Sequence, residues 1–81
     1  MTGITDRQQE ILHFINDYFA EEDQMPSYAT IGKEFDIFPN AAVDITGILI
    51  TKGILARNVM GKLKRGVYYY HHVPSKWERT A

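Results

Sequence analysis

Three cations, Lys62, Lys64 and Arg65, lie within four consecutive residues, and a glycine flanks the group on each side. Ammonium and guanidinium groups pair with phosphate oxygens, so the cluster is suited to contact an anionic polymer. A solvated surface turn has a similar composition, but the flanking glycines favour a protruding loop and phosphate contact. Lys52 and Arg57 would extend the same positive track.

Charge is divided unevenly along the 81 residues. Residues 1–51 carry nine acids against Arg7 and Lys33, a formal −7, whereas residues 52–81 carry seven bases against Glu78, a formal +6. The net charge of −1 hides this division. A chain of this kind can present one positive patch to an anionic partner while the remainder stays acidic.

Catalytic and metal chemistry find little support. The chain has no cysteine, which excludes a disulfide framework and a thiolate zinc site. His71 and His72 are adjacent, and neighbours on a strand point to opposite faces, so they cannot easily share a metal ion. Glu21 and Glu22 are typical of a solvated run, and no nucleophile or phosphate-binding glycine motif is present. We expect no enzymatic activity, no cofactor, no metal and no small-molecule substrate.

Length and composition predict one small domain. Apolar residues make up 44% of the chain, which suits a packed globule. The apolar stretches are too short to span a membrane, and the N-terminus lacks a basic-then-apolar signal pattern. We therefore expect a cytoplasmic protein without a membrane partner.

Two helices are predicted in the first half of the chain. Residues 6–21 have apolar residues at helical spacing, and Thr5 with Gln8 forms a capping-box pattern at their start. Residues 28–35 form a shorter apolar stripe preceded by Ser27, a favourable N-cap residue.

A third helix is predicted over residues 39–52. Pro39 suits its first turn, and Gly53 suits the position just after its end. Its inward stripe would consist of Ala42, Ile45, Ile48 and Leu49. Its opposite face would carry Asn40, Val43, Asp44, Gly47 and Thr51.

A β-hairpin is predicted after the third helix because the apolar period changes to two. Its first strand would span 54–59, its return strand 67–71, and its basic loop 60–66. Residues 73–81 look like a C-terminal tail with Trp77 as the one large anchor.

Three helices followed by a hairpin with a basic loop predict a mainly α protein with a small β-hairpin, a winged helix-turn-helix. In this arrangement the third helix enters the major groove of duplex DNA, the second crosses the backbone, and the hairpin contacts phosphates. We assign residues 1–72 to this DNA-binding domain and 73–81 to the tail.

Residues 4–70 resemble the N-terminal DNA-binding domain of the LexA repressor family. The matching segments are ITDRQQEIL, the P-S-x-A-x-I pattern, PNAA and KGI-L, of which RQQE and PNAA are the most specific. The resemblance implies a sequence-specific regulator of transcription, a repressor, with 39–52 as recognition helix. The base-facing residues that it implies are Asn40, Ala41, Val43 and Asp44. The expected phosphate contacts are Ser27, Tyr28, Lys52, Lys62, Lys64 and Arg65.

The chain departs from the family pattern at several places. Val43-Asp44 replaces two consecutive acids, Gly47 replaces a basic residue, and the wing is longer and more basic. The family's self-cleaving serine–lysine protease half, which also dimerises, is not recognised, so we expect no self-cleavage. One module alone is expected to bind DNA weakly. We therefore expect a homodimer, joined near Trp77, that binds two half-sites. The setting that fits is a bacterial or phage-infected cell, with a nucleoid-associated protein from a phage or mobile element.

Some residues on the third helix have two interpretations. Asn40 suits either adenine recognition or helix capping. Asp44 either accepts from a cytosine amino group or forms salt bridges. Val43 suits a thymine methyl group or an apolar contact with a protein, and together with Gly47 and the acidic first half it favours a rival hypothesis. In that hypothesis the winged helix binds a polymerase, a replication factor or a host regulator.

Overall fold

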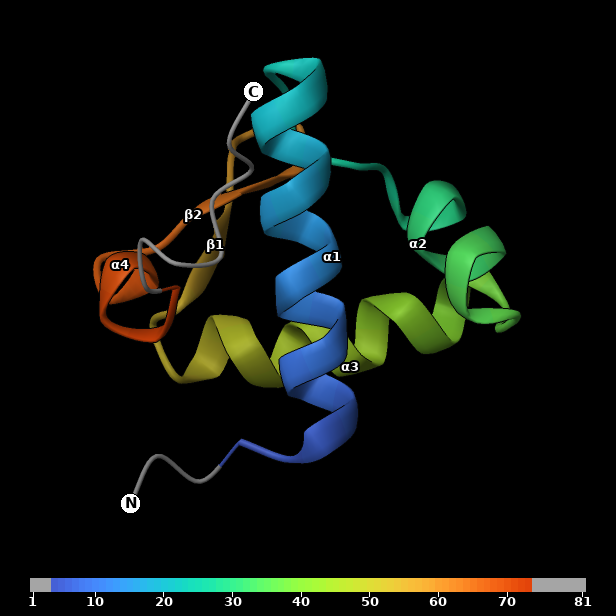
Figure 1. The fold of residues 1–81 in the computed structure, drawn as a ribbon, viewed down its shortest axis with the longest axis horizontal. Helices are drawn as coiled ribbons and strands as arrows, with labels where there is room; N and C mark the ends of the chain where they lie inside the picture. Colours follow the sequence, from blue (N-terminus) through green and yellow to red (C-terminus); the bar gives the residue numbers. More distant parts are fainter. Residues whose placement is uncertain (1–3, 74–81) are drawn as a thin grey trace.

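The described part of the chain folds as three helices followed by a two-stranded antiparallel hairpin and a short fourth helix (Figure 1). The computed structural model describes residues 4–73. Its elements are α1 (Asp6–Glu22), α2 (Tyr28–Phe35), α3 (Pro39–Thr51), β1 (Leu55–Arg57), β2 (Leu63–Arg65) and α4 (Tyr69–His72). The predicted winged helix-turn-helix is confirmed by this order of elements. None of the helices within residues 4–73 has the length and apolarity needed to cross a membrane.

The starts of the first two helices are fixed by side-chain caps. The Gln8 backbone N–H donates to Thr5 Oγ1 at 3.2 Å, and the Thr5 backbone N–H donates to Gln8 Oε1 at 3.0 Å, so the capping box is confirmed. Ser27 Oγ accepts from the Thr30 backbone N–H at 3.1 Å at the start of α2. These bonds satisfy backbone donors that would otherwise lack a partner.

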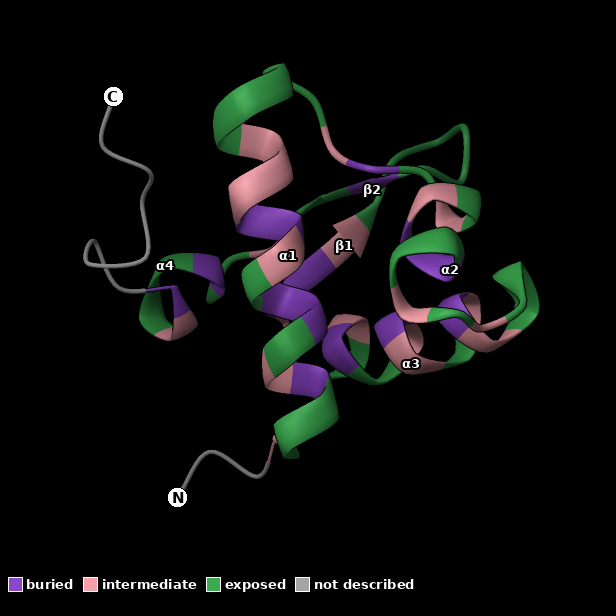
Figure 2. Cartoon of the chain, turned by 45° about the vertical axis from the view of Figure 1, so that its right-hand side comes forward, coloured by how far each residue is buried: buried purple, intermediate pink, exposed green. Residues whose placement is uncertain are grey.

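The hydrophobic core draws on α1, α2, α3, the hairpin and α4, and its buried segments are purple in Figure 2. Its buried members are Ile11, Leu12, Ile15, Ile31, Ala42, Leu49, Ile54, Leu55, Leu63, Tyr69 and Val73. Burying one leucine or isoleucine side chain stabilises a fold by about 1.5–3 kcal/mol. Val73, the first residue of the expected tail, therefore packs with the core, whereas Trp77 lies outside the described residues.

A close backbone approach joins α2 to the connection before α3. A Cβ atom on Gly32 would lie 2.5 Å from the Ile37 carbonyl oxygen, so only glycine fits without a shift. The Ile37 backbone N–H also donates to the Gly32 carbonyl at 2.9 Å. This contact holds the end of α2 close to the connection that leads into α3.

The predicted positions of the return strand and of the basic loop are wrong. The return strand is Leu63–Arg65, paired so that Leu55, Ala56 and Arg57 face Arg65, Lys64 and Leu63 respectively. Residues 67–71 were expected to continue the sheet, but Tyr69–His72 is helical. Their strand propensity is overridden by tertiary packing, since Tyr69 turns into the core and donates a buried hydrogen bond to Asn16 Oδ1 at 2.9 Å.

The hairpin turns earlier than expected because Asn58 closes it. The Asn58 side-chain Oδ1 accepts from the backbone N–H groups of Met60 at 2.8 Å and Lys62 at 3.0 Å. Gly61 occupies the left-handed region (φ 80°), and its N–H donates to the Asn58 carbonyl. The turn therefore spans residues 58–62, and Lys64 and Arg65 lie on β2 rather than at the tip.

The prediction of the inner face of α3 is also wrong at one position. Ile48 is 43% exposed, and Thr46 is buried instead. A threonine is tolerated there because its hydroxyl donates to the Ala42 carbonyl at 2.8 Å, which satisfies the buried polar group.

Candidate nucleic-acid interface

Helices α2 and α3 and the hairpin turn lie on one side of the molecule, and α4 lies on the other (Figure 2). On α3, Asn40 and Asp44 are exposed, and Ala41 and Val43 are half-buried. All four belong to the first two turns of the helix. The start of α3 therefore presents a mixed polar and apolar surface to solvent.

Asn40 does not cap α3. Phe38 is the N-cap residue and makes no side-chain capping bond. Within residues 4–73, no hydrogen bond holds the Asn40 side chain and no ion pair holds the Asp44 carboxylate, so both are available to a ligand. The Asp44 carboxylate therefore has no salt-bridge partner in the described part of the chain, which disfavours the interpretation of this residue as part of a salt bridge.

The guanidinium of Arg57 lies against the outer face of α3. Its Nε donates to the Tyr28 hydroxyl at 3.1 Å, and that hydroxyl donates to the Gly61 carbonyl at 3.2 Å. Its Nη2 lies 3.9 Å from the place that a Cβ of Gly47 would occupy. One arginine thus connects β1, α2, α3 and the hairpin turn.

Arg57 supplies positive charge where α3 has none of its own. Asp44 is the one ionisable residue within Pro39–Thr51. From its position in the sequence, Arg57 was expected only to extend a positive track, and its placement beside Gly47 was missed. The signal that was available is Gly47 itself, since a glycine where the family has a basic residue leaves space for a cation from elsewhere.

The three hairpin cations do not all lie at the tip of the hairpin, and the expectation that they do is wrong. Lys62 is exposed in the turn, and Lys64 is exposed on the face of the hairpin opposite to that of Leu63 and Arg65. The Arg65 guanidinium lies 4.8 Å from the centre of the Phe19 ring of α1, and it donates a hydrogen bond to the Tyr70 hydroxyl. Arg65 therefore packs towards α1 and α4.

Lys52 is separate from the start of the recognition helix. It is exposed at the C-cap of α3, and at 1.5 Å per residue it lies about 18 Å along the helix axis from Asn40. The two residues can engage only distant parts of one ligand.

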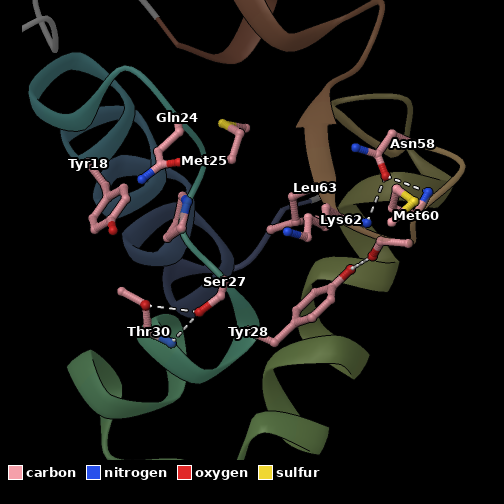
Figure 3. Close-up of a pocket in the computed structure, with 12 residues that line it drawn as sticks. Tyr18, Gln24, Met25, Ser27, Tyr28, Thr30, Asn58, Met60, Lys62 and Leu63 are labelled. Carbon is pink, nitrogen blue, oxygen red and sulfur yellow. Dashed lines mark hydrogen bonds between the residues drawn. The ribbon is translucent and has the colours of Figure 1, made fainter.

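A hollow of about 710 Å³ separates the hairpin turn from the end of α1 and the first turn of α2 (Figure 3). Its polar lining side chains are Tyr18, Gln24, Ser27, Tyr28, Thr30, Asn58 and Lys62. Among the described residues that line it there is no acid, and Lys62 is the one charged residue. The described lining therefore carries one positive charge and no negative charge, and Met25, Pro26, Met60, Gly61 and Leu63 complete it.

Other sites of chemistry are not evident in residues 4–73. No group of three histidine or acidic residues in this range could hold a metal ion. Burial, with a smaller contribution from Tyr70, raises the pKa of Tyr69 from 10.0 to about 12. Since its hydroxyl is bonded to Asn16 in the core, this perturbed group is structural.

Helix α3 beside α2, followed by the hairpin, defines the class of winged helix-turn-helix proteins. The family model for the LexA DNA binding domain matches residues 1–65, which end at the last residue of β2. The chain belongs to the LexA DNA-binding domain family. Membership indicates sequence-specific DNA binding by a regulator. No curated protein matched the chain.

Proposed function

We propose that this protein represses transcription by binding duplex DNA with α3 in the major groove. The observation that carries the proposal is the Arg57 guanidinium held over Gly47 by Tyr28, on the face where Asn40 and Asp44 are exposed. An α-helix fits the major groove, where each base pair presents a distinct pattern of donors and acceptors.

Base recognition is assigned to the first two turns of α3. The Asn40 amide suits a bidentate contact with adenine, and the Asp44 carboxylate suits the amino group of cytosine. Ala41 and Val43 suit contact with thymine methyl groups. Because Asp44 repels phosphates, the nearby cation Arg57 is needed to keep this end of the interface attractive.

Backbone contacts are assigned to the rim of the hollow and to the ends of the interface. Ser27, Tyr28 and Lys62 line the hollow and would contact one strand of the duplex. Lys52 and Lys64 are exposed and would contact phosphates farther along. The contribution of Arg65 is expected to be small, because its guanidinium is engaged by Phe19 and Tyr70.

A repressor with one such module gains affinity by binding as a pair. Half-sites about 10 base pairs apart place two recognition helices on the same side of the duplex. We therefore propose an operator with two half-sites and a homodimer assembled on it.

Selection of bound duplexes from a random-sequence pool tests the proposal. The expected result is a short motif, and an affinity for it that falls linearly with salt on logarithmic axes. The contrary result is undetectable affinity for mixed-sequence DNA at low salt, in which case DNA is not the partner.

A protein-binding role is the second candidate, and Ile48 and Phe38 favour it. Ile48 is 43% exposed on α3 and Phe38 is 83% exposed just before that helix. Exposed apolar residues that form a continuous patch are typical of protein interfaces, and this candidate requires that Phe38 and Ile48 both contact the partner. In that case Ile48→Ser would abolish binding of the protein partner and would leave any affinity for DNA unchanged.

A further inference from the structure

The hollow of about 710 Å³ beside the hairpin turn has the size and composition of a small-molecule site. Pockets of about 300–1,000 Å³ that combine apolar walls with a few polar groups are typical of such sites. The apolar part of its lining comes mainly from the rings of Tyr18 and Tyr28 and from Met25, Met60 and Leu63. Rings and thioethers both make favourable contacts with an aromatic ring, so these walls suit an aromatic molecule.

Four polar groups around the hollow are available to a ligand. They are the Tyr18 hydroxyl, the Gln24 amide, the Asn58 amide nitrogen and the Lys62 ammonium. Asn58 Oδ1 already accepts from two backbone N–H groups of its own turn, which leaves the amide nitrogen as a donor. Within the described part of the chain, none of the four takes part in a hydrogen bond or an ion pair. Figure 3 shows them on facing walls, Tyr18 and Gln24 at the end of α1 and Asn58 and Lys62 on the hairpin.

The charge of the lining indicates which aromatic molecule fits. Lys62 is the one charged residue among the described residues that line the hollow, and none of these residues is an acid. A molecule with one negative charge pairs with this ammonium group through a charge-assisted hydrogen bond. A cation finds no partner there, and a dianion leaves one of its charges unpaired. The lining therefore favours a ring system that carries a single carboxylate or a similar group.

We propose that the hollow binds a small aromatic monoanion, and that this ligand and duplex DNA exclude each other. Tyr28 and Lys62 line the hollow, and both are assigned above to contacts with a DNA strand. A ligand that covers these two residues lowers the affinity for DNA, and by linkage DNA lowers the affinity for the ligand by the same factor. The ligand would thus act as an inducer that releases the protein from its operator. The exclusion rests on the proposed function, whereas ligand binding by the free protein does not.

The test uses β-naphthoate as the aromatic monoanion and β-naphthamide as its neutral match. Each compound is titrated into the isotope-labelled full chain without DNA, and changes in the backbone amide NMR shifts locate the binding site. The largest changes are expected at residues 24–30 and 58–63, which form the two walls. Naphthoate is expected to bind about tenfold more tightly than naphthamide, because only naphthoate pairs with the Lys62 ammonium.

Two variants separate the charge of the hollow from its apolar wall. Lys62→Gln is expected to weaken naphthoate binding about tenfold and to leave naphthamide binding unchanged. Met60→Ser is expected to weaken the binding of both compounds by a similar factor, since it removes a thioether from the wall. Lys33→Gln is the matched control, because it removes a charge from an exposed position of α2 outside the lining, and no change is expected. A circular dichroism melt checks that each variant remains folded.

The same two compounds test the exclusion on a duplex selected from the random-sequence pool. Naphthoate is expected to raise the apparent dissociation constant of the duplex in proportion to its concentration once the hollow is mostly occupied. About tenfold more naphthamide is expected to be needed for the same effect, in line with its weaker binding to the free protein. Fluorescence anisotropy of the labelled duplex measures both curves.

Each contrary outcome has a separate meaning. Undetectable naphthoate binding, shift changes outside the hollow, or equal affinity for naphthoate and naphthamide overturns the ligand site and leaves the proposed function standing. Naphthoate bound in the hollow with an unchanged affinity for the duplex overturns the exclusion. Absence of duplex binding by the wild type overturns the proposed function and the exclusion together, and the titrations without DNA still decide whether the hollow binds an aromatic monoanion.

Discussion

Arg57 on β1 donates from its Nε to the hydroxyl of Tyr28, the first residue of α2, at 3.1 Å. The two residues are 29 positions apart in the chain, and both belong to the face that includes the outer side of α3. This bond aims a planar five-donor cation along the surface that we assign to DNA. It also makes the DNA-binding role of the hairpin depend on α2.

Arg57→Gln is expected to weaken DNA binding about tenfold or more and to flatten the salt dependence by about one phosphate contact. The reason is the loss of the cation beside Gly47. Fluorescence anisotropy over a range of salt concentrations measures both quantities. Arg65→Gln is the matched control, since that arginine packs on Phe19 and Tyr70, and its effect is expected to be smaller. Equal losses in the two variants would contradict the assignment.

Tyr28→Phe is expected to reduce DNA affinity several-fold while changing stability little. The change removes the hydroxyl that bonds both Arg57 and the Gly61 carbonyl, and each such bond contributes only about 0.5–1.5 kcal/mol to folding. Affinity and a denaturant midpoint measured on the same sample separate the two effects. A large drop in the midpoint with unchanged affinity would show that the bonds serve the fold alone.

Two glycines within helices are expected to respond oppositely to alanine. Gly47→Ala places a Cβ at ordinary contact distance, 3.9 Å, from Arg57 Nη2, so the helix propensity of alanine should raise the free energy of unfolding. The gain expected from propensity is about 0.5–1 kcal/mol. Gly32→Ala forces a Cβ to 2.5 Å from the Ile37 carbonyl oxygen and should lower the free energy of unfolding. Urea unfolding of both variants tests the pair, and a stable Gly32→Ala protein would refute the close approach.

The Tyr69 phenol predicts how stability changes at high pH. Its pKa is 10.0 in the unfolded chain and about 12 in the folded chain, so folding favours the protonated form. The contribution of this group is complete below pH 10.0 and is lost as the pH rises towards about 12. The difference in unfolding free energy between wild type and Tyr69→Phe is therefore expected to be constant up to pH 10.0 and to shrink above it. A constant difference at higher pH would contradict burial of the phenol.

The helices could be predicted from the sequence because their signals are local. Thr5 with Gln8 and Ser27 with Thr30 are cap partners three residues apart, and apolar spacing marked the faces. The hairpin was harder because Leu63, the residue that packs inward from β2, lies between two lysines in a stretch that looks like a loop. The aromatic run after it has high strand propensity, yet the core draws Tyr69 into a helical turn.

Part of the candidate site could also be predicted from the sequence, because some of its residues are related by local spacing. Asn40 and Asp44 are four residues apart on one helix, so their shared exposure follows from helical spacing. The meeting of Arg57 with Tyr28 and Gly47 depends on how the hairpin folds back, and no local pattern specifies it. The divergence of Lys64 and Arg65 follows from strand alternation, which became evident only when the turn was placed at residues 58–62.

The Ile37 carbonyl lies close to Gly32, so the packing beside α3 and the recognition of DNA by α3 depend on different atoms. The close approach of α2 to the connection before α3 is made by main-chain atoms, so it does not involve the side chains exposed at Asn40 or Asp44. Mutational drift at these outward positions can thus change which operator is chosen while the scaffold stays intact. Such a scaffold lends itself to retargeting, either by evolution or by laboratory selection.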